Sequence, residues 1–281
     1  MRDAKGETAV ERERERRRER ERKHFITVAR AIVSSSLSTS SLPPPSLSLS
    51  LSLTHATKPK PNPHKTINQP PNRTVVSVAG DGYVILAAST RLSTGYSILS
   101  REATKVCRLS EGVLVANAGF AGDGVTLQKV LKSRAVAYQH AHRRPMPVHA
   151  AAQLLGNTLY YKRFFPYYAF CLCAGLDEEN KGAVYTYDAV GSHERVGFSC
   201  QGSGKDLIQP VLDNQLKSIS PLALPAGPWK TTPLPKEEAV DLVKSAFVAA
   251  GERDIYTGDS VQIFVLTKEG LSEEVLELKK D

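Results

Sequence analysis

The segment from Thr74 to Lys105 constrains the fold more than any other part of the sequence. Two runs rich in β-branched and apolar residues, VVSVA and YVILAAS, stand on either side of Asp81-Gly82. An Asp-Gly pair between two such runs is the strongest short-range indication of a tight β-hairpin. The sequence therefore predicts two neighbouring antiparallel strands where the folded part of the chain begins.

Strand and helix patterns alternate along the rest of the chain. Further strands are predicted in VCRL, GVLVANAG, YAFCLCAGL, GAVYTYDAV, RVGFSC, SVQIFVLT and LSEEVLEL. Helices are predicted over residues 127–138, after Pro147, over residues 205–216 and between Pro235 and Gly251. Segregated runs joined mainly by hairpins favour an α+β domain, and we expect a four-layer α/β/β/α sandwich of two antiparallel sheets.

The positive charge of the chain is confined to its N-terminal part. Residues 1–73 carry 15 Lys and Arg against 7 Asp and Glu, a net charge of +8, whereas the remaining residues carry 22 of each. A neutral folded part argues against binding of nucleic acid by this domain. The absence of any 18-residue apolar run in the sequence excludes a membrane-spanning helix.

Residues 1–72 read as a disordered low-complexity tail and linker, and residues 73–281 as one globular domain. The run RERERRRERERK has no apolar stripe that a helix could bury. Two other interpretations stay open: the acid-poor, Ser-rich stretch after Glu21 is typical of an organelle transit peptide, and the Glu-Arg and Ser-Leu repeats are what an untranslated leader would encode. We expect this tail to be trimmed, untranslated or excluded to solvent.

The cysteines and one long loop give weaker indications. Cys107, Cys171, Cys173 and Cys200 form no CxxC pair and have no nearby His at zinc-ligand spacing, so we expect buried free thiols and no metal site. The proline-rich loop over residues 218–235, which carries the single Trp, is long enough to be functional or to contact another chain.

Four motifs resemble segments of the proteasome β-subunit family: LLGNTLYYKRFFPYYAF, YTYDAVGSHERVGFSCQGSG, IQPVLDNQLKS and ERDIYTGD. The resemblance runs from about Arg73 to Asp281. It implies the N-terminal-nucleophile hydrolase fold, no cofactor, and assembly with other β subunits and with α subunits into the 20S core particle, which has two α and two β heptameric rings. It also implies a location in the cytoplasm and nucleus, with an organelle as the alternative if the tail is a transit peptide.

Active members of this family use an N-terminal Thr, freed by self-cleavage after a Gly, whose own α-amino group acts as the base. In those members an Asp lies 16 residues and a Lys 32 residues after the Thr. Lys105, in the context RxxxK, matches the Lys, and Ser89, in Ala-Ala-Ser-Thr-Arg, stands where the Asp is expected. Both counts lead back to Arg73, so the nucleophile and the acid are both predicted to be lost.

Other matches to the family's site are retained. Gly119 matches the oxyanion glycine, Ser203 lies in the Gly-Ser-Gly turn, and Asp254 and Thr257 match the Asp and Ser that support the nucleophile. Together with Lys105, we interpret them as remnants in a scaffold, because buried polar groups persist when they satisfy one another.

The resulting hypothesis is a non-catalytic structural β subunit that supports protein degradation by the particle through its place in the β ring. An active threonine peptidase that uses Thr74 after processing is the alternative. It requires removal of residues 1–73 and a slip of one residue, which turns a strand side chain to the other face of the sheet.

Overall fold

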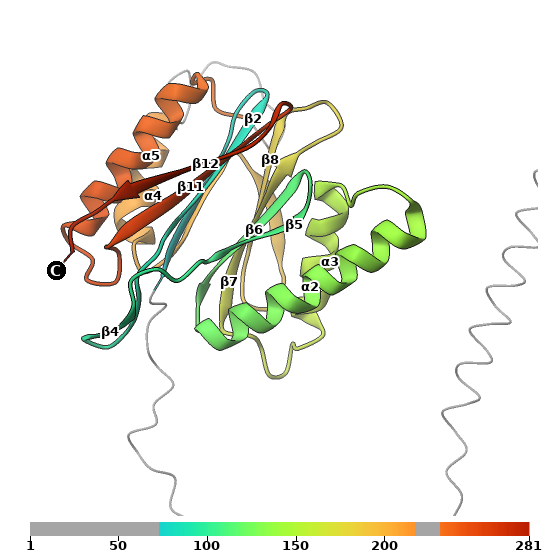
Figure 1. Cartoon of the computed structure of the whole chain (residues 1–281), viewed down its shortest axis with the longest axis horizontal. Helices are drawn as coiled ribbons and strands as arrows, with labels where there is room; N and C mark the ends of the chain where they lie inside the picture. Colours follow the sequence, from blue (N-terminus) through green and yellow to red (C-terminus); the bar gives the residue numbers. More distant parts are fainter. Residues whose placement is uncertain (1–72, 217–230, 281) are drawn as a thin grey trace, which may run out of the picture. The chain divides into compact units, whose positions relative to one another are not determined.

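The computed structural model describes residues 73–216 and 231–280 (Figure 1). The chain divides into two compact units, Met1–Pro61 and Asn62–Asp281, and every described residue belongs to the second. The predicted tail over residues 1–72 lies outside the described residues. So does Trp229, with most of the predicted loop over residues 218–235.

The predicted hairpin forms the middle of the first of two five-stranded sheets. Val75 pairs with Ala88 and Ala79 with Val84, and Gly82 takes the positive φ of 77° that the turn requires. The sheet has the order β10-β1-β2-β11-β12 and is antiparallel throughout. Its strands are β1 (Thr74–Ala79), β2 (Tyr83–Ser89), β10 (Phe198–Gly202), β11 (Ser260–Thr267) and β12 (Gly270–Glu277).

The second sheet is also antiparallel and has the order β5-β6-β7-β8-β9. Its strands are β5 (Val106–Ser110), β6 (Val113–Gly119), β7 (Ala169–Leu176), β8 (Gly182–Tyr187) and β9 (His193–Val196). A separate short pair, β3 (Leu92–Thr94) and β4 (Ser97–Ser100), was not predicted from the sequence.

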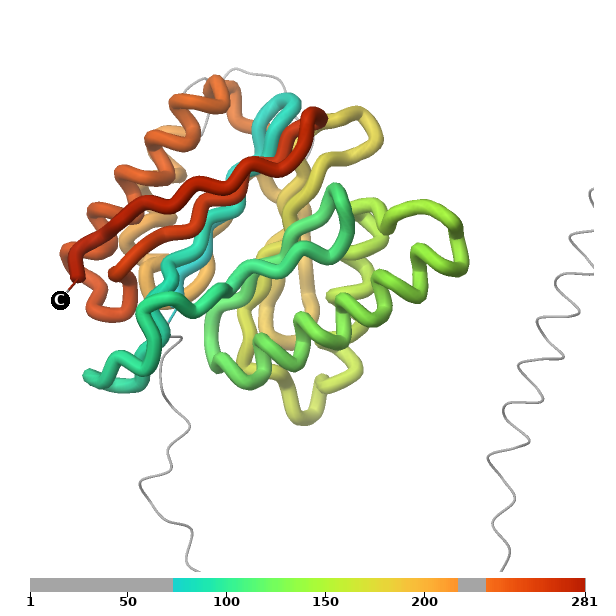
Figure 2. The backbone as a smooth tube through the Cα atoms, in the orientation of Figure 1, coloured from blue at the N-terminus to red at the C-terminus, as the bar shows by residue number. Residues whose placement is uncertain are grey.

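Two pairs of helices cover the outer faces of the sheets (Figures 1 and 2). The pair α2 (Ala121–His142) and α3 (Val148–Tyr160) packs on the second sheet, and α4 (Lys205–Leu216) and α5 (Lys236–Gly251) pack on the first. Helix α2 begins six residues before the predicted start at Leu127 despite two early glycines. Gly124 is needed there, because a Cβ would lie 1.8 Å from Nδ2 of Asn117.

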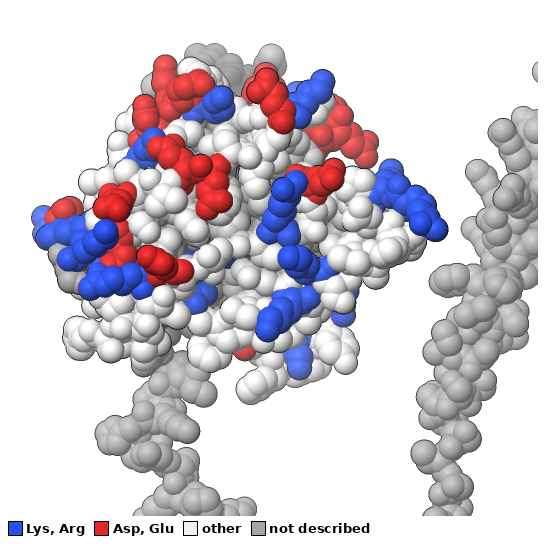
Figure 3. Space-filling model, viewed as in Figure 1, with Lys and Arg blue, Asp and Glu red and all other residues white. Residues whose placement is uncertain are grey.

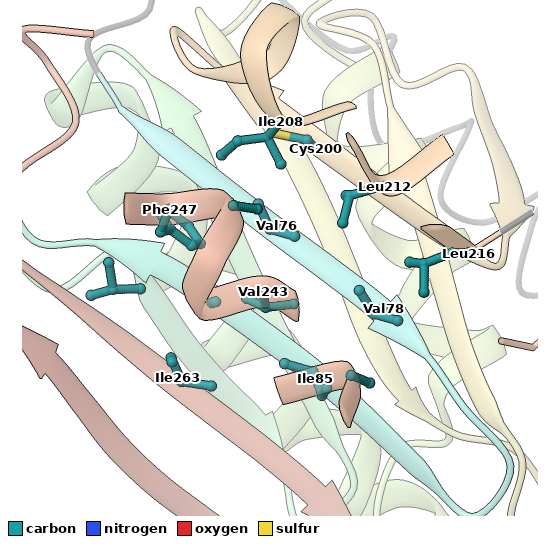
Figure 4. Close-up of a cluster of buried hydrophobic side chains, with 14 of the residues drawn as sticks. Val76, Val78, Ile85, Cys200, Ile208, Leu212, Leu216, Val243, Phe247 and Ile263 are labelled. Atoms are coloured by element: carbon teal, nitrogen blue, oxygen red, sulfur yellow. The ribbon is translucent and has the colours of Figure 1, made fainter. Parts of the chain in front are cut away.

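Alternating side chains of β1 and β2 are buried in two different cores, which is why both strands are buried along their whole length. Val76 and Val78 face the helices and pack with Phe247 of α5 (Figure 4). Val75 and Ala79 face the second sheet. A third core lies between that sheet and α2 and α3, so the predicted four-layer α/β/β/α sandwich is confirmed.

The prediction of one continuous strand in RVGFSC was wrong. The structure divides this segment at Gly197: β9 pairs with β8 in the second sheet, and β10 pairs with β1 in the first. The local pattern is similar on both sides of Gly197, so only the pairing partners show that the chain changes sheets.

Candidate functional site

The residues matched to the family's site gather where β1 begins. Arg73 directly precedes β1, Ser89 ends β2, Lys105 directly precedes β5, and Ser203 directly follows β10. The amide of Ser203 donates to the carbonyl of Arg73 at 3.2 Å, which fixes the turn after β10 against the start of β1. Arg73, Ser89 and Lys105 are all buried. The two sheets therefore bring together residues that are far apart in the sequence.

Lys105 and Ser89 are in direct contact. The ammonium of Lys105 is fully buried and donates to Oγ of Ser89 at 2.7 Å. Burial and the nearby charge of Arg73 lower the pKa of Lys105 well below its ordinary value, although Asp254 and Asp259 partly oppose this shift. The partner of this lysine is therefore a neutral hydroxyl rather than a carboxylate.

Arg73 is the residue to which both counts lead, and only 4% of it is exposed. Its Nε has no hydrogen-bond partner within the described part of the chain, and burial lowers its pKa. Gly202 passes very close to it with φ of 106°, and a Cβ there would lie 1.5 Å from the carbonyl oxygen of Arg73. The backbone at the start of β1 is thus held tightly by the end of β10.

The retained polar residues form a second network, centred on Thr74. Its Oγ1 lies 2.7 Å from the hydroxyl of Thr257 and 3.3 Å from that of Ser203, and it accepts from the amide of Gly204 at 3.0 Å. Oδ2 of Asp254 accepts from Ser203 at 2.7 Å and from Thr257 at 2.6 Å. Ser203, Asp254 and Thr257, which the sequence analysis matched to the family's site, therefore meet around Thr74.

Gly119 has a structural requirement of its own. It ends β6 with φ of 102°, and a Cβ would lie 2.5 Å from the carbonyl oxygen of Tyr168. Its neighbour Ala118 reaches the end of β10, where its Cβ would lie 3.1 Å from a Cβ on Gly202. Close passage of two backbones therefore demands a glycine at position 119 whether or not an oxyanion is ever bound there.

The sequence analysis missed a buried ion-pair cluster beside this site. Nε of Arg91 donates to Oδ2 of Asp259 at 2.8 Å, Arg101 also contacts this carboxylate, and Nη1 of Arg91 donates to the carbonyl of Ile255 at 2.9 Å. Burial would raise the pKa of Asp259, but hydrogen bonds from the two arginines lower it on balance. Arg91 ends the motif Ala-Ala-Ser-Thr-Arg and Asp259 ends the motif ERDIYTGD, so the sequence already contained both partners of this ion pair.

The cluster ties the end of β2 to the loop that carries Asp254 and Thr257. A Cβ on Gly258 would lie 2.5 Å from Cζ of Arg91, so the arginine side chain packs directly on this loop. Asp259 itself takes a positive φ of 65°. We infer that the ion pairs position the loop, and through it the hydroxyl network around Thr74.

The remaining predictions concern cysteines, metals and membranes. All four cysteines are free; three are buried, and Cys107 is half-buried, which corrects the expectation for that residue. Burial raises the pKa of Cys171 and Cys173 to about 12. Over residues 73–216 and 231–280 no cluster of His, Cys, Asp or Glu could hold a metal ion, and none of the helices there has the length and hydropathy to span a membrane.

Comparison with known proteins gives a consistent result over the globular part. The family model described as "Proteasome subunit" matches residues 72–266. The proteins named proteasome subunit beta type-1 of Arabidopsis thaliana and Petunia hybrida are each 57% identical over 208 residues, which cover 74% of this chain and 93% of theirs. The Dictyostelium discoideum protein of that name is 46% identical over 209 residues, covering 74% and 87%.

Proposed function

The chain belongs to the proteasome subunit family, and we propose that Arg73 and Ser89 make it a β subunit without peptidase activity. It is a β subunit of the 20S core particle, a hetero-oligomer of α and β subunits, and it supports protein degradation there by helping to build the β ring. The observation that carries the non-catalytic assignment is the buried contact between Lys105 and the Ser89 hydroxyl beside Arg73.

The physical argument concerns the groups that a threonine peptidase needs. A hydroxyl becomes a nucleophile when a base accepts its proton, and in this family the Thr supplies both groups. The guanidinium of Arg73 has no hydroxyl, and it stays protonated at neutral pH, so it can serve neither as nucleophile nor as base. Ser89 supplies no charge to orient Lys105. The remaining groups can hold the backbone in place but lack an attacking atom.

The alternative nucleophile, Thr74, is held by structural hydrogen bonds. Its hydroxyl is bound to Thr257, Ser203 and the amide of Gly204, and none of its hydrogen-bond partners in the described part of the chain is an amine or an imidazole. N-terminal sequencing of the chain in assembled particles tests this alternative. A mature terminus at Thr74, together with acylation of Thr74 by an epoxyketone or β-lactone probe, would refute the non-catalytic proposal.

The surface of the domain supports assembly with other chains. Three aromatic side chains after α3 are almost fully exposed: Tyr161 (84%), Phe164 (99%) and Phe165 (86%). The turn between β3 and β4 exposes Tyr96 to 99%. Large exposed apolar side chains of this kind mark protein contacts. Figure 3 shows acidic side chains over α5 and β12 and basic side chains over α2. This face of the domain therefore carries both signs of charge.

Co-purification tests the assembly directly. An affinity-tagged copy of the chain is expected to recover α and β subunits in a particle of the size of two α and two β rings. Peptidase activities of that particle are expected to be unchanged by Lys105→Met, since in a working site the lysine is essential. A tagged chain that remains monomeric, or a particle that loses a peptidase activity with Lys105→Met, would contradict the proposal.

We also propose that the protein acts in the cytoplasm and nucleus and that the predicted tail, residues 1–72, is absent from assembled particles or excluded to solvent. Fluorescence microscopy of the full-length chain with a C-terminal fluorescent protein tests the location, and import into an organelle would support the transit-peptide alternative. Mass spectrometry of purified particles tests trimming of the tail.

A further inference from the structure

We propose that residues 160–165, called here the aromatic turn, anchor this chain to one neighbouring subunit by inserting Phe164 and Phe165 into an apolar groove bordered by carboxylates. This contact rests on the proposed function, because the partner is another subunit of the 20S core particle. The aromatic turn lies in the connection from α3 to β7, which projects beyond the sheets and helices (Figures 1 and 2).

Solvent reaches all the aromatic side chains of the aromatic turn. The exposed fractions are Tyr160 65%, Tyr161 84%, Phe164 99% and Phe165 86%. An aromatic side chain buries about 150–250 Å² when it is covered, so a partner that covered these residues would remove roughly 500–800 Å² of this chain from water. Each partner in a standard protein interface buries about 800 Å². The aromatic turn alone therefore supplies more than half of the area that a specific contact needs.

The backbone of the aromatic turn is held by hydrogen bonds of its own. Four amides within residues 161–165 donate to carbonyls of residues 157–162, at 2.9–3.0 Å. The amide of Tyr168 donates to Oδ2 of Asp123 at 2.8 Å, which fastens the chain after the turn to α2. Ordering a loop on binding costs free energy, and a turn whose backbone is already bonded pays less of it. The aromatic side chains are therefore presented in place before a partner arrives.

The aromatic turn also carries positive charge that its own part of the chain does not neutralise. Lys162 and Arg163 lie between the two pairs of aromatic residues, and both are exposed. Neither forms an ion pair with another described residue. Residues 124–176 contain seven Lys and Arg and no Asp or Glu. Carboxylates at the border of the partner's groove would complement these charges, and such complementarity selects the correct partner.

The balance of apolar and charged groups favours a protein groove over a nucleic acid. Phe164 and Phe165 have no polar group, so both rings gain from an apolar pocket, and aromatic side chains and Arg are enriched where protein interfaces bind most strongly. Single-stranded nucleic acid also stacks on aromatic rings, but it needs a positively charged groove that follows its backbone. The aromatic turn offers two cations on a globular part that is neutral overall.

Photo-cross-linking in assembled particles tests the contact. The photoreactive amino acid p-benzoylphenylalanine is incorporated in place of Phe164 in the tagged chain, purified particles are irradiated, and mass spectrometry identifies the attached peptide. We expect attachment to one other subunit, at apolar residues that have Asp or Glu nearby. The proposal would be overturned by no cross-link, by cross-links to several subunits or to a segment without Asp or Glu, by attachment to nucleic acid, or by attachment to residues 1–72 or 217–230 of the same chain.

A competition for places in the particle measures how much the two rings contribute. A chain with Phe164→Ser and Phe165→Ser is produced together with a differently tagged unaltered chain, and their ratio in particles is compared with their ratio in total protein. Loss of both rings should reduce incorporation at least about tenfold. The matched control, Phe164→Met and Phe165→Met, keeps flexible apolar side chains and should stay within about threefold of the unaltered chain.

The outcomes of this competition separate the contact from the proposed function. Equal incorporation of the serine variant and the unaltered chain would overturn the contact, as would equal losses of the serine and methionine variants. Failure of the unaltered chain to enter particles would instead contradict the proposed function. Both rings are exposed, so the fold of the domain does not depend on them.

Discussion

Replacement of Thr74 by Val separates a structural from a catalytic role for this residue. Thr74 is fully buried, and Val keeps its branched shape while exchanging the hydroxyl for a methyl group. Ser203 and Thr257 keep Asp254 as a partner after this change. The amide of Gly204 loses its acceptor, because it donates to Oγ1 of Thr74 at 3.0 Å.

The expected magnitude follows from this single orphaned donor. A buried N–H group left without an acceptor costs about 1–3 kcal/mol. If the loss is expressed as easier local opening around Gly204, its amide should exchange with solvent about 5 to 150 times faster. Peptidase activities of the assembled particle should stay unchanged, because the hydroxyl holds the backbone and attacks nothing.

Hydrogen–deuterium exchange of assembled particles, read by mass spectrometry on peptides that span Gly204, measures this effect. Thr126→Val is the matched control: it removes the same atom from an exposed residue of α2 whose hydroxyl donates to the carbonyl of Gly122 at 2.8 Å. A change within about 0.5 kcal/mol is expected there. Unchanged exchange at Gly204, or loss of a peptidase activity in Thr74→Val, would refute the reasoning.

Three further predictions concern the packing and charge of the domain. Gly202→Ala should prevent incorporation into particles, because its Cβ would lie 1.5 Å from a carbonyl oxygen. Gly270→Ala, which is also at positive φ but has open space around it, should still assemble. Recovery of particles through a tag on the variant chain measures both effects. Phe247→Ala should lower the free energy of unfolding by about 3–5 kcal/mol, since the ring is fully buried, and Val248→Ala on the exposed face should change it little. Thermal unfolding at fixed particle concentration measures both, and equal behaviour of the two variants would contradict the prediction. Stability should rise with pH from the lowered folded-state pKa of Lys105 up to about 10.4, because the unfolded state binds more protons in that window. Lys105→Met should lose this contribution, and an identical dependence of stability on pH in both proteins would contradict the prediction.

The sequence predicted those strands, turns and helices whose pattern depends only on neighbouring residues. The hairpin around Asp81-Gly82 and the four helices were predictable because turn chemistry and periodicity depend on neighbouring residues. The exchange of sheets at Gly197 was not, because the same alternation fits either sheet and only pairing with distant strands selects one. The pair β3 and β4 was missed for a similar reason: three- and four-residue strands carry too little pattern.

The sequence by itself determined which side chains stand at the counted positions, since the spacing from Ser89 and from Lys105 leads to Arg73 without any structure. It also indicated which faces of the predicted helices are apolar, because that follows from the spacing of apolar residues along each segment. Only the tertiary structure decided which polar groups meet. It joined Lys105 to Ser89, gathered Ser203, Asp254 and Thr257 around Thr74, and left Nε of Arg73 without a partner in the described residues. Contacts between distant segments depend on how two sheets stack, and no local pattern encodes that stacking.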